Sequence, residues 1–411
     1  MTERVAVPPS GWDGDDLARL GEAIGFVTGR SRFIGGWVRD TLARATPGDL
    51  DIGTQLLPEE VLAKAGAAGL SVWSSPSGLA HGTVGIVVGG KPVEVTTLRR
   101  DVATDGRRAT VAFTDDWRED AARRDFTLNA LSADPATGEL YDYFDGAGDL
   151  RAGIVRFIGD PLHRIAEDHL RILRFFRFHS RFGRGAPEPA AYDACAARAN
   201  DLMALSRERI ADELLKLLSH AAPAEAVRQM LARGILKPVL PEIDQAGLER
   251  LQELVVAERA AGVTGDPVRR LAALVPPADA DEISARLKLS KVQRKRLALA
   301  VSMPASGARE LAYRVGPEAA IDQLLLVGEA EAAAGLAGWA PPRLPLSGGA
   351  LVKRGLGAGP LVATALKMVE ERWIGEQFPA VERVEIIADQ VAAELLRDQN
   401  SNAASASSGR A

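Results

Sequence analysis

The sequence predicts an α+β fold, in which an N-terminal domain of strands and helices is followed by a long series of helices. Short β-branched runs, among them RFIGG, DLDIGT, TVGIVVGG and KPVEVTTL, alternate with turn residues and with helical segments near 38–45 and 58–68. From about Ile154 to about Leu396 the strand pattern disappears, and Ala, Leu, Arg and Glu recur at helical spacing. Breaks rich in proline and glycine, such as RGAPEP and WAPPRLPLSGG, connect these helices.

Length and composition limit the class of protein. A chain of 411 residues with 46% hydrophobic residues can bury a sizeable core, and we expect about two to four domains. The N-terminal stretch MTERVAVPPSGWDGDD lacks the features of a signal peptide, and no apolar run approaches the roughly 18 residues of a membrane span. We therefore expect a cytoplasmic protein without a membrane partner.

Cysteine and histidine usage limits the chemistry. Cys195 is the only cysteine, which excludes an internal disulfide, and the five histidines show no spacing typical of a zinc site. Any metal ion must therefore be held by carboxylates.

Charge is unevenly distributed along the chain. The 50 Lys and Arg residues against 55 Asp and Glu residues give a net charge of −5, which does not by itself indicate a nucleic-acid-binding protein. Between residues 151 and 184, however, the sequence contains eight arginines and only three acidic residues, Asp160, Glu167 and Asp168. The arginines of this basic stripe are Arg151, Arg156, Arg164, Arg171, Arg174, Arg177, Arg181 and Arg184.

The stretch GGWVRDTLARATPGDLDIGT, residues 35–54, carries the first candidate site. Gly35 and Gly36 follow a strand-like run and precede a helical stretch, so their amides would lie at a helix N-terminus, where phosphate can bind. A strand-to-helix turn also favours glycine for its backbone angles alone, and this simpler interpretation stays open.

Further along the same stretch, Asp49 and Asp51 flank Leu50 in an apolar run. Because side chains alternate along a strand, both carboxylates would point to one side, roughly 7 Å apart, where they can hold one or two Mg²⁺ ions. Glu94, in the strand-like run VEVTTL, offers a third carboxylate for a two-metal site. Alternatively, the two aspartates form a turn and a solvated strand end, and Glu94 is an exposed strand residue.

A third segment, ARRDFTLNALS at residues 122–132, is rich in polar groups for its apolar frame. Arg123 and Arg124 can grip phosphate. We expect Asp125 and Asn129, four residues apart, to share one face of a helix, where Asn129 can hydrogen-bond a sugar hydroxyl. The structural alternative is that Asp125 caps the helix and Asn129 ties down a loop.

The stretch HRIAEDHLRILRFFRFHSRF, residues 163–182, predicts one helix with an apolar and a basic face. Its apolar stripe consists of Ile165, His169, Ile172, Leu173 and Phe176. Because Asp168 and Arg171 lie one turn apart on the other side, the simplest expectation is an i,i+3 ion pair on a solvated surface.

A more specific hypothesis gives Asp168 and Arg171 a role in choosing a nucleotide base. A carboxylate accepts from an exocyclic amine, and a guanidinium donates to the acceptors of a Watson–Crick edge. Cytosine and adenine carry that amine, whereas uracil and guanine present a carbonyl there and would be rejected by roughly 1–3 kcal/mol per contact. The two side chains would therefore select C and A.

Taken in order, GGWVRD, DLDIGT, VEVTTL, RRDFTLNAL and EDHLRILRFFRF resemble the motifs of the bacterial class II tRNA nucleotidyltransferase and poly(A) polymerase family. Each motif alone is weak, but five in series within residues 35–178 are highly specific. The resemblance extends through LSRERIADELLKLL and, more loosely, into the segment that begins LSGGALVKRG, so it covers most of the chain.

The resemblance implies a nucleotidyltransferase head of the palm type, a mixed sheet with helices, at residues 1–153. All-helical neck, body and tail domains would follow at residues 154–220, 221–340 and 341–398. The neck would recognise the nucleotide base, and the body and tail would bind tRNA. We expect the polar residues 399–411 to be disordered.

Individual roles follow from the same resemblance. Asp49 and Asp51 resemble the metal ligands, with Glu94 as a third catalytic carboxylate. Asp168 and Arg171 resemble an amino-acid template for the incoming base, which agrees with the selection of C and A. The remaining nucleotide-binding residues would be Gly35, Gly36, Arg39, Arg124, Asp125, Asn129, Arg174 and Arg177.

The implied reaction is the template-independent addition or repair of the 3′-terminal CCA of tRNA. With Mg²⁺ as cofactor in a two-metal mechanism, the RNA 3′-hydroxyl would attack the α-phosphate of CTP or ATP in line and release pyrophosphate. The partners would be CTP, ATP and tRNA, bound through its 3′ end and its acceptor/TΨC region. No obligate protein partner is evident.

Other activities stay open. Poly(A) polymerases share this chemistry, and some bacteria divide the work between a CC-adding and an A-adding enzyme. The short, nearly neutral C-terminal tail and the stretch HGTVGIVVGGKPVEVTT favour the tRNA enzymes, and the segment at residues 99–116 resembles the flexible loop needed for A addition. A non-catalytic RNA-binding protein is less well supported, because two carboxylates facing a polyanion are electrostatically costly without a metal ion between them.

Overall fold

A computed structural model describes residues 3–7, 12, 14–104, 109–304 and 306–408. The chain divides into two compact units, and each is described by itself. The first unit comprises Met1–Leu248 with Ala285–Leu289, and the second comprises Glu249–Ser284 with Ser290–Ala411. The division into head, neck, body and tail stays a prediction.

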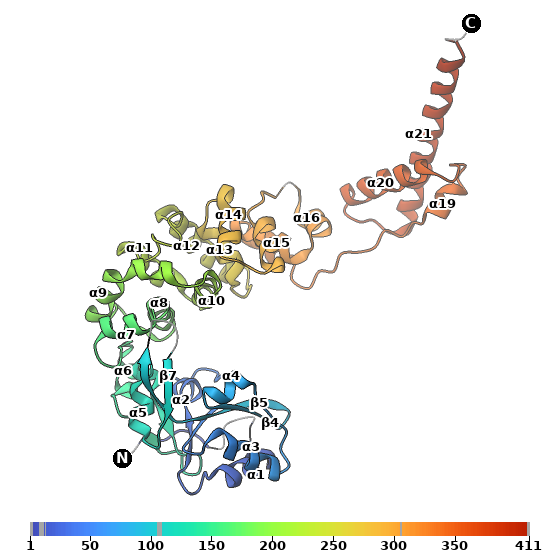
Figure 1. The fold of residues 1–411 in the computed structure, drawn as a ribbon. Coiled ribbons are helices and arrows are strands. Elements are labelled where there is room, and N and C mark those ends of the chain that lie inside the picture. The colour runs from blue at the N-terminus through green and yellow to red at the C-terminus, as the bar shows by residue number, and fades with distance from the viewer. Residues whose placement is uncertain (1–2, 8–11, 13, 105–108, 305, 409–411) are drawn as a thin grey trace. The chain divides into compact units, whose positions relative to one another are not determined.

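A seven-stranded mixed sheet forms the centre of the N-terminal region. Its strands are β1 (Ser31–Ile34), β2 (Asp51–Thr54), β3 (Val72–Trp73), β4 (Thr83–Val88), β5 (Lys91–Thr97), β8 (Ser132–Ala133) and β9 (Leu140–Tyr141). They lie in the order β3-β4-β5-β2-β1-β8-β9, with β2 and β5 parallel and the other neighbours antiparallel. Strands β4 and β5 of this sheet are labelled in Figure 1. The four β-branched runs of the sequence correspond to β1, β2, β4 and β5 and are confirmed as strands.

A separate hairpin stands apart from this sheet. Strands β6 (Arg99–Thr104) and β7 (Ala109–Phe113) pair with each other in antiparallel register. They occupy most of the segment 99–116, for which the resemblance implies a flexible loop. Residues 105–108, at the tip, lie outside the described residues.

Helices surround the sheet and continue the first unit. Those of the head region are α1 (Asp15–Ile24), α2 (Gly36–Leu42), α3 (Pro58–Ala67), α4 (Pro76–Ala80), α5 (Trp117–Ala122) and α6 (Gly146–Ala152), with a 3₁₀ turn at Thr127–Asn129. Those that follow are α7 (Pro161–Glu167), α8 (Arg171–Phe182), α9 (Pro189–Ala197), α10 (Arg207–Leu218) and α11 (Pro223–Ala232), with a 3₁₀ helix at Ala199–Ala204. The core of the sheet packs against α1 and α3 through residues such as Leu20, Phe33 and Val61.

The helix predicted over residues 163–182 is interrupted. It consists of α7 and α8, because Asp168 leaves the helical region of backbone angles with φ −151° and ψ 106°. The Asp168 carboxylate accepts a hydrogen bond from the amide of Leu170 at 3.1 Å, next to the start of α8. The prediction of one continuous helix is therefore wrong at residues 168–170.

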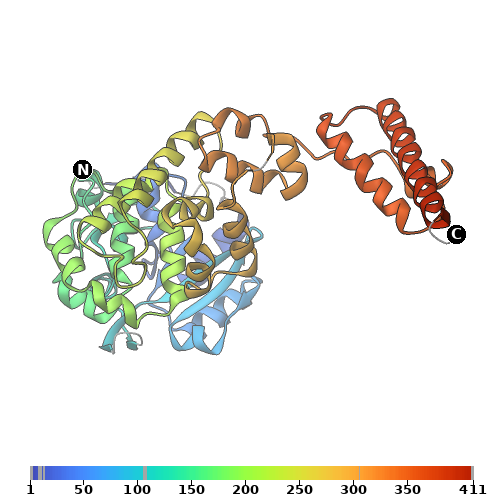
Figure 2. The ribbon, with the colours of Figure 1, turned by 90° about the horizontal axis from the view of Figure 1, so that it is seen from above.

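The second unit is helical throughout its described part, as the sequence predicts. Its helices are α12 (Gln245–Ala260, beginning in the first unit), α13 (Pro267–Leu274), α14 (Ala280–Arg286, ending in the first unit), α15 (Lys291–Ala300), α16 (Ala308–Val315), α17 (Pro317–Leu326), α18 (Ala330–Ala334), α19 (Gly348–Val352), α20 (Pro360–Gly375) and α21 (Val381–Ser408), with a 3₁₀ turn at Pro277–Asp279. Helices α20 and α21 lie side by side over a core that contains Trp373 and Ile387 (Figure 2).

Helix α21 extends into the segment for which the sequence predicts disorder. It ends at Ser408, and residues 409–411 lie outside the described residues. The stretch it adds contains several alanines, which have the highest intrinsic helix propensity.

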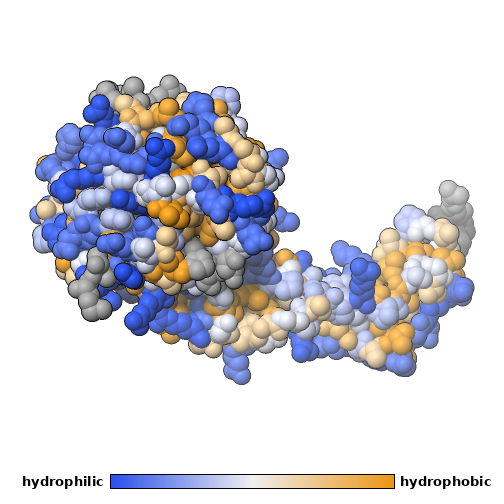
Figure 3. All heavy atoms as spheres, turned by 90° about the horizontal axis from the view of Figure 1, so that it is seen from below, coloured by the Kyte–Doolittle hydropathy of each residue, from blue (hydrophilic) through white to orange (hydrophobic). Residues whose placement is uncertain are grey.

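The surface is mixed in character. Hydrophilic residues cover much of the face shown in Figure 3, with hydrophobic residues in smaller groups between them. Within the described residues, none of the helices combines the length and the apolar character needed to cross a membrane.

Gly146, the first residue of α6, allows this helix to approach the backbone of the 3₁₀ turn. A Cβ atom on Gly146 would lie 2.2 Å from the carbonyl oxygen of Thr127. We therefore expect Gly146→Ala to lower the free energy of unfolding by about 1–3 kcal/mol, measured by thermal or chemical denaturation. As a control, Gly66→Ala in α3 meets no neighbour within 4 Å and should raise stability by up to about 1 kcal/mol. Equal stabilities of the two variants would contradict this account.

Candidate active site

A cavity of about 510 Å³ brings together motifs that are far apart in the sequence. It is lined by Gly35, Gly36, Arg39, Asp51, Arg99, Arg123, Arg124, Asp125, Asn129, Asp168, Arg171, Arg174 and Phe178. Three of the residues singled out from the sequence, Asp49, Glu94 and Arg177, lie outside this lining. Arg99 and Phe178 were not among the residues singled out.

The glycine pair forms the turn between β1 and α2. Gly35 has a φ of 64° and caps α2, whose first residue is Gly36. A Cβ atom on Gly35 would lie 3.0 Å from Nη1 of Arg124. Glycine is therefore required here for both the backbone angle and the close approach of the arginine, and the predicted strand-to-helix turn is confirmed.

Arg39 is a buried part of the cavity wall. Its Nε donates to Asp40 at 2.7 Å, and its Nη1 donates to the Asn129 side chain at 2.6 Å. The guanidinium also lies over the ring of Phe182, with 4.7 Å to the centroid. Burial lowers the pKa of Arg39, although the adjacent Asp40 carboxylate opposes this shift.

The segment around Asp125 is not the expected helix. The amide of Thr127 donates to Arg156 at 3.0 Å, and the amide of Ile158 donates to Asp125 at 3.1 Å. Because these backbone groups pair with residues 156–158, they cannot form helical hydrogen bonds, and only the 3₁₀ turn Thr127–Asn129 remains. The prediction that Asp125 and Asn129 share one helical face is therefore wrong.

Asp125 and Asn129 are nevertheless in contact. Asn129 Nδ2 donates to Asp125 at 2.8 Å, and Arg174 Nε donates to the other carboxylate oxygen at 2.7 Å. Burial opposes ionisation of Asp125, but the Arg174 guanidinium and the Asn129 amide hold the pKa of this carboxyl below its usual value. The carboxylate therefore ties α8 to the head region.

Asp120 is a positioning residue that sequence analysis did not identify. It is buried, and it pairs with Arg123 at 2.8 Å and with Arg124 at 3.1 Å. Although burial opposes ionisation, the two guanidiniums hold the pKa of Asp120 below its usual value. The sequence could have predicted this role, because Asp120 precedes Arg123 by three residues and Arg124 by four, and residues at these spacings meet on one side of a helix.

Asp168 and Arg171 both line the cavity, but the ion pair expected between them is absent from the described structure. Asp168 pairs instead with Arg209 of α10, at 3.0 Å. Arg171 Nη1 donates to Glu167 at 2.5 Å and to the carbonyl oxygen of Arg164 at 2.8 Å. The break between α7 and α8 separates the two side chains, which explains why each has a partner of its own.

Two other arginines of the basic stripe turn inward. Arg164, expected on the basic face, is buried, and its Nη2 donates to the carbonyl oxygens of Arg123 and Arg124 at 2.6 and 2.5 Å. Arg177 Nε lies 2.7 Å from the buried carboxylate of Glu213. Glu213 was not identified from the sequence. It could have been, because it is an acidic residue on the apolar face of the helix that forms α10, where a buried carboxylate needs a cationic partner.

The carboxylates proposed for the metal site lie on neighbouring strands. Asp51 is the first residue of β2 and is aligned with Glu94 in the parallel strand β5. Asp49 stands in an exposed bend before β2, so the assumption that it belongs to the strand is wrong. Burial, together with the nearby charges of Glu94 and Asp49, raises the pKa of Asp51 to about 6.

This arrangement fits the chemistry of a divalent cation. Carboxylate oxygens are the preferred ligands of Mg²⁺, and a cation would remove the electrostatic penalty at Asp51. Among the described residues, however, no three His, Cys, Asp or Glu side chains converge closely enough to form a metal-binding group. The prediction of Asp49 and Asp51 as metal ligands, with Glu94 as third carboxylate, stays a prediction.

Comparison with protein families gives two matches. Residues 31–156 match the model described as "Poly A polymerase head domain". Residues 186–246 match the model described as "Probable RNA and SrmB- binding site of polymerase A".

Related proteins cover most of the chain. The protein named "CCA tRNA nucleotidyltransferase 1, mitochondrial" from Danio rerio is 34% identical over 379 residues, which cover 87% of this chain and 86% of that protein. The Homo sapiens protein of the same name is 33% identical over 363 residues, covering 83% of this chain and 82% of that protein. A "CCA-adding enzyme" from Oceanobacillus iheyensis is 38% identical over 201 residues, 48% of each chain.

Solved structures share the fold. A Bacillus stearothermophilus CCA-adding enzyme in complex with CTP superimposes with a TM-score of 0.72 at 26% identity, covering 95% of this chain and 100% of that chain. A Thermotoga maritima CCA-adding enzyme complexed with tRNA has a TM-score of 0.63 at 20% identity and covers 93% and 96% of the two chains. These likenesses confirm the predicted α+β fold with a helical remainder.

The raised pKa of Asp51 predicts a pH-dependent effect of Asp51→Asn in metal-free protein. A folded-state pKa near 6, above the usual 3.8, means that ionised Asp51 destabilises the fold fully above about pH 6 and not at all below about pH 3.8. At pH 7.5 with EDTA, Asp51→Asn should therefore raise the free energy of unfolding, on the order of 1 kcal/mol. This gain should disappear near pH 4 in thermal melts. An equal rise in the free energy of unfolding at both pH values would contradict this prediction. So would the same rise in the exposed control Asp49→Asn.

Proposed function

The chain belongs to the class II tRNA nucleotidyltransferase and poly(A) polymerase family, in its CCA-adding branch, and we propose that it completes the 3′ CCA end of tRNA with CTP and ATP. Membership makes it a nucleotidyltransferase, since relatives named for this activity match over more than four fifths of its length. The observation that carries the proposal is that one cavity is lined by Asp51 of the sheet, by Asp168 at the break between α7 and α8, and by Arg171, the first residue of α8.

Base selection would take place at Asp168 and Arg171. A carboxylate has about four acceptor positions and a guanidinium five donors, so neither is exhausted by its protein partners. Within the described residues, the hydrogen bonds of the Arg171 guanidinium leave from Nη1. Its Nε and Nη2 can therefore face a base, while Glu167 and Arg209 keep the two side chains from turning away. This is the arrangement that we propose for accepting C and A and rejecting U and G.

The triphosphate would occupy the middle of the cavity. Gly35 and Gly36 leave space for it, and Arg123 and Arg124 carry guanidiniums that suit phosphate oxygens. Both arginines are held by Asp120, which limits their freedom before the nucleotide binds. Arg39 contributes positive charge from a fixed position, while Asp125, Asn129, Arg174 and Arg177 hold the wall in place.

Enzymes of this family generally use divalent metal ions. We propose Mg²⁺ held by Asp49 and Asp51, with Glu94 on the adjacent strand as the third catalytic carboxylate. When bound, the metal supplies stabilisation of negative charge on the reacting oxygens. The contribution of the chain itself is to keep Asp51 partly buried beside Glu94, where its carboxylate is poorly solvated and favours a cation.

The proposed reaction joins the tRNA 3′-hydroxyl oxygen to the α-phosphorus of CTP or ATP. The bond between the α-phosphorus and the bridging oxygen breaks, the hydroxyl proton is lost to solvent, and pyrophosphate leaves. The residues of the cavity orient the nucleotide for in-line attack. The neck at residues 154–220 would present the base-selecting residues, and the body and tail at 221–398 would hold the acceptor/TΨC region of tRNA. A cytoplasmic location stays a prediction.

Incorporation assays test this function directly. We expect the protein, with Mg²⁺, CTP and ATP, to add C, C and A to a tRNA transcript that ends before CCA, and then to stop. Asp49→Ala should reduce incorporation by at least about 100-fold, because several kcal/mol of charge stabilisation would be lost, while tRNA binding is retained.

The control for this assay is Asp15→Ala, which removes an exposed aspartate of α1 and should leave incorporation unchanged. Normal incorporation by Asp49→Ala would contradict its role as a metal ligand. A growing ladder of A would instead indicate a poly(A) polymerase, and addition of only CC or only A would indicate a partial enzyme.

Substitution at Asp168 tests base selection. Asn can turn its amide to donate to the carbonyl of uracil, so Asp168→Asn should lower the discrimination of CTP over UTP by about 10-fold or more. The ratio of kcat/KM values for CTP and UTP is the measurement. Glu208→Gln, an exposed change on α10, is the matched control. Unchanged discrimination in Asp168→Asn would refute the template role.

A further inference from the structure

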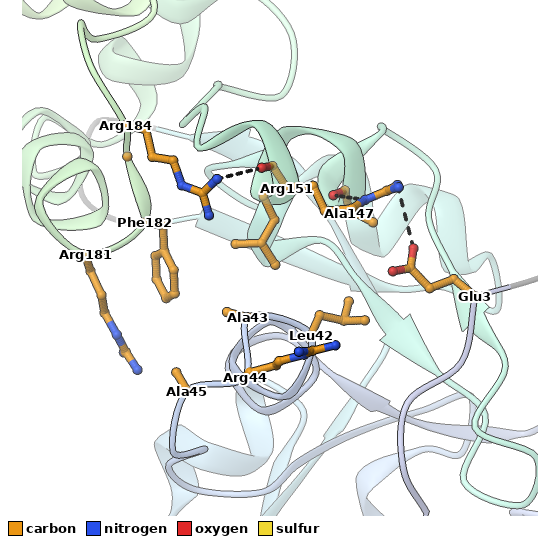
Figure 4. A pocket seen from close by; sticks show the side chains of 12 residues that line it. Glu3, Leu42, Ala43, Arg44, Ala45, Ala147, Arg151, Arg181, Phe182 and Arg184 are labelled. Carbon is orange, nitrogen blue, oxygen red and sulfur yellow. Dashed lines mark hydrogen bonds and ion pairs between the residues drawn. The ribbon is translucent and has the colours of Figure 1, made fainter.

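A second cavity, of about 370 Å³, lies where the C-terminal ends of α2, α6 and α8 meet (Figure 4). Four arginines line it, Arg44, Arg151, Arg181 and Arg184, against one carboxylate, that of Glu3. Three of these arginines belong to the basic stripe, and none of the four lines the candidate active site. We propose that this cavity is a second phosphate-binding site, separate from the site of nucleotide transfer. The proposal goes beyond the proposed function and does not rest on it.

Part of the positive charge has a structural use. Helix C-terminal ends carry partial negative charge, and arginines commonly hydrogen-bond their last carbonyl groups. Arg151, in the last turn of α6, is used within its own helix: its Nε donates to the carbonyl oxygen of Ala147, one turn earlier, at 3.0 Å, and its Nη2 lies 3.7 Å from the Glu3 carboxylate. Arg151 is therefore explained by its own helix, and the proposal depends on the other arginines.

Arg44 is the clearest unexplained group. Its φ of 55° lies in the left-handed region, where glycine is favoured at the end of a helix such as α2. Its side chain is exposed and makes no hydrogen bond or ion pair within the part of the chain that the structure describes. The backbone angle closes the end of α2, where the amide of Ala45 donates to the carbonyl oxygen of Asp40 at 2.9 Å. The helix end does not account for an arginine at this position in place of glycine, and the guanidinium at the cavity is available to a ligand that is not part of the chain.

Arg184 is held at the cavity by the end of α6. Its amide donates to Gly153 at 2.9 Å, and a Cβ atom on Gly153 would lie 2.5 Å from Cγ of Arg184. Gly153, with a φ of 71°, thus provides the space in which the arginine side chain lies. The guanidinium makes one long hydrogen bond, 3.3 Å from Nη1 to the carbonyl oxygen of Arg151, which leaves most of its five donors for a ligand.

Phosphate is the ligand chemistry that matches this lining. Guanidiniums bind phosphate oxygens in a bidentate manner, and the Phe182 ring points into the cavity beside them, where it offers an apolar surface (Figure 4). The volume is within the range of small-molecule pockets. The phosphate could belong to a free nucleotide or pyrophosphate, or to the backbone of an RNA, and the two sources can be separated by experiment.

The test uses Arg44→Gly combined with Arg184→Gln. Arg44→Gly removes the guanidinium together with the unfavourable backbone conformation, so Tm should not fall, and loss of binding cannot then be attributed to unfolding. Arg181 is left intact, because it pairs with Asp40, which also holds Arg39 of the candidate active site. Arg30→Gln, an exposed arginine outside both cavities, is the control.

Two measurements distinguish the sources of phosphate. Calorimetric titration with pyrophosphate in EDTA should give one binding site more per chain for the wild type and the control than for the double variant. Alternatively, a tRNA transcript should bind the double variant at least about 5-fold more weakly, with a reduced salt dependence, if RNA supplies the phosphate.

Wild-type behaviour of the double variant in both measurements would overturn the proposal. CTP incorporation by the same variant is a separate readout. If the double variant still incorporates CTP but has lost phosphate binding, the result supports a second site. If neither the wild type nor the variant incorporates CTP, the result counts against the proposed function alone.

Discussion

The ion pair between the buried Asp125 and the partly buried Arg174 is the contact on which the candidate active site depends. It joins the head region to α8, with the Arg174 Nη2 2.6 Å from the carboxylate. Removing Arg174 would leave the buried carboxylate of Asp125 without its cation, and an uncompensated buried charge typically costs about 3–5 kcal/mol. Asn129 connects the pair to Arg39, and Glu213 connects Arg174 and Arg177 to α10. Side chains from distant parts of the sequence are thereby held in one network.

Aromatic packing supports this network from the apolar side of α8. Phe126 of the head contacts Phe157 at 4.8 Å and Phe178 at 5.3 Å between ring centroids, and Phe157 stacks on Phe175 at 5.9 Å. Buried charges are tolerated where every partner is held in place, and packed rings supply that rigidity. The basic and apolar faces of α8 therefore perform linked tasks, since one fixes the helix and the other supplies guanidiniums.

The basic stripe divides between two surroundings. Arg171 and Arg174 line the candidate active site, where buried or partly buried carboxylates hold them in position. Arg181 and Arg184 line the second cavity, where fewer carboxylates are available to them. At Asp51 the excess charge is negative instead of positive, because the carboxylates of Glu94 and Asp49 lie nearby. Arginines held by carboxylates enter the candidate active site in a fixed position, whereas a guanidinium without a carboxylate partner among the described residues, such as that of Arg184, keeps most of its donors for a ligand.

The sequence by itself determined the fold class, the main strands, the helical remainder and most residues of the cavity. Strand and helix periods are local, and motifs such as GGWVRD and RRDFTLNAL carry their chemistry in adjacent positions. Only the tertiary structure decided which charged side chains and which backbone groups pair with each other. Asp125 pairs with Arg174 and Asp168 with Arg209 because segments separated by more than forty residues meet, and the pairing of residues 125–127 with 156–158 replaces a helix that local spacing favours. Sequence spacing does not contain these contacts, since they arise only when the head packs against α8 and when the segment between α7 and α8 packs against α10.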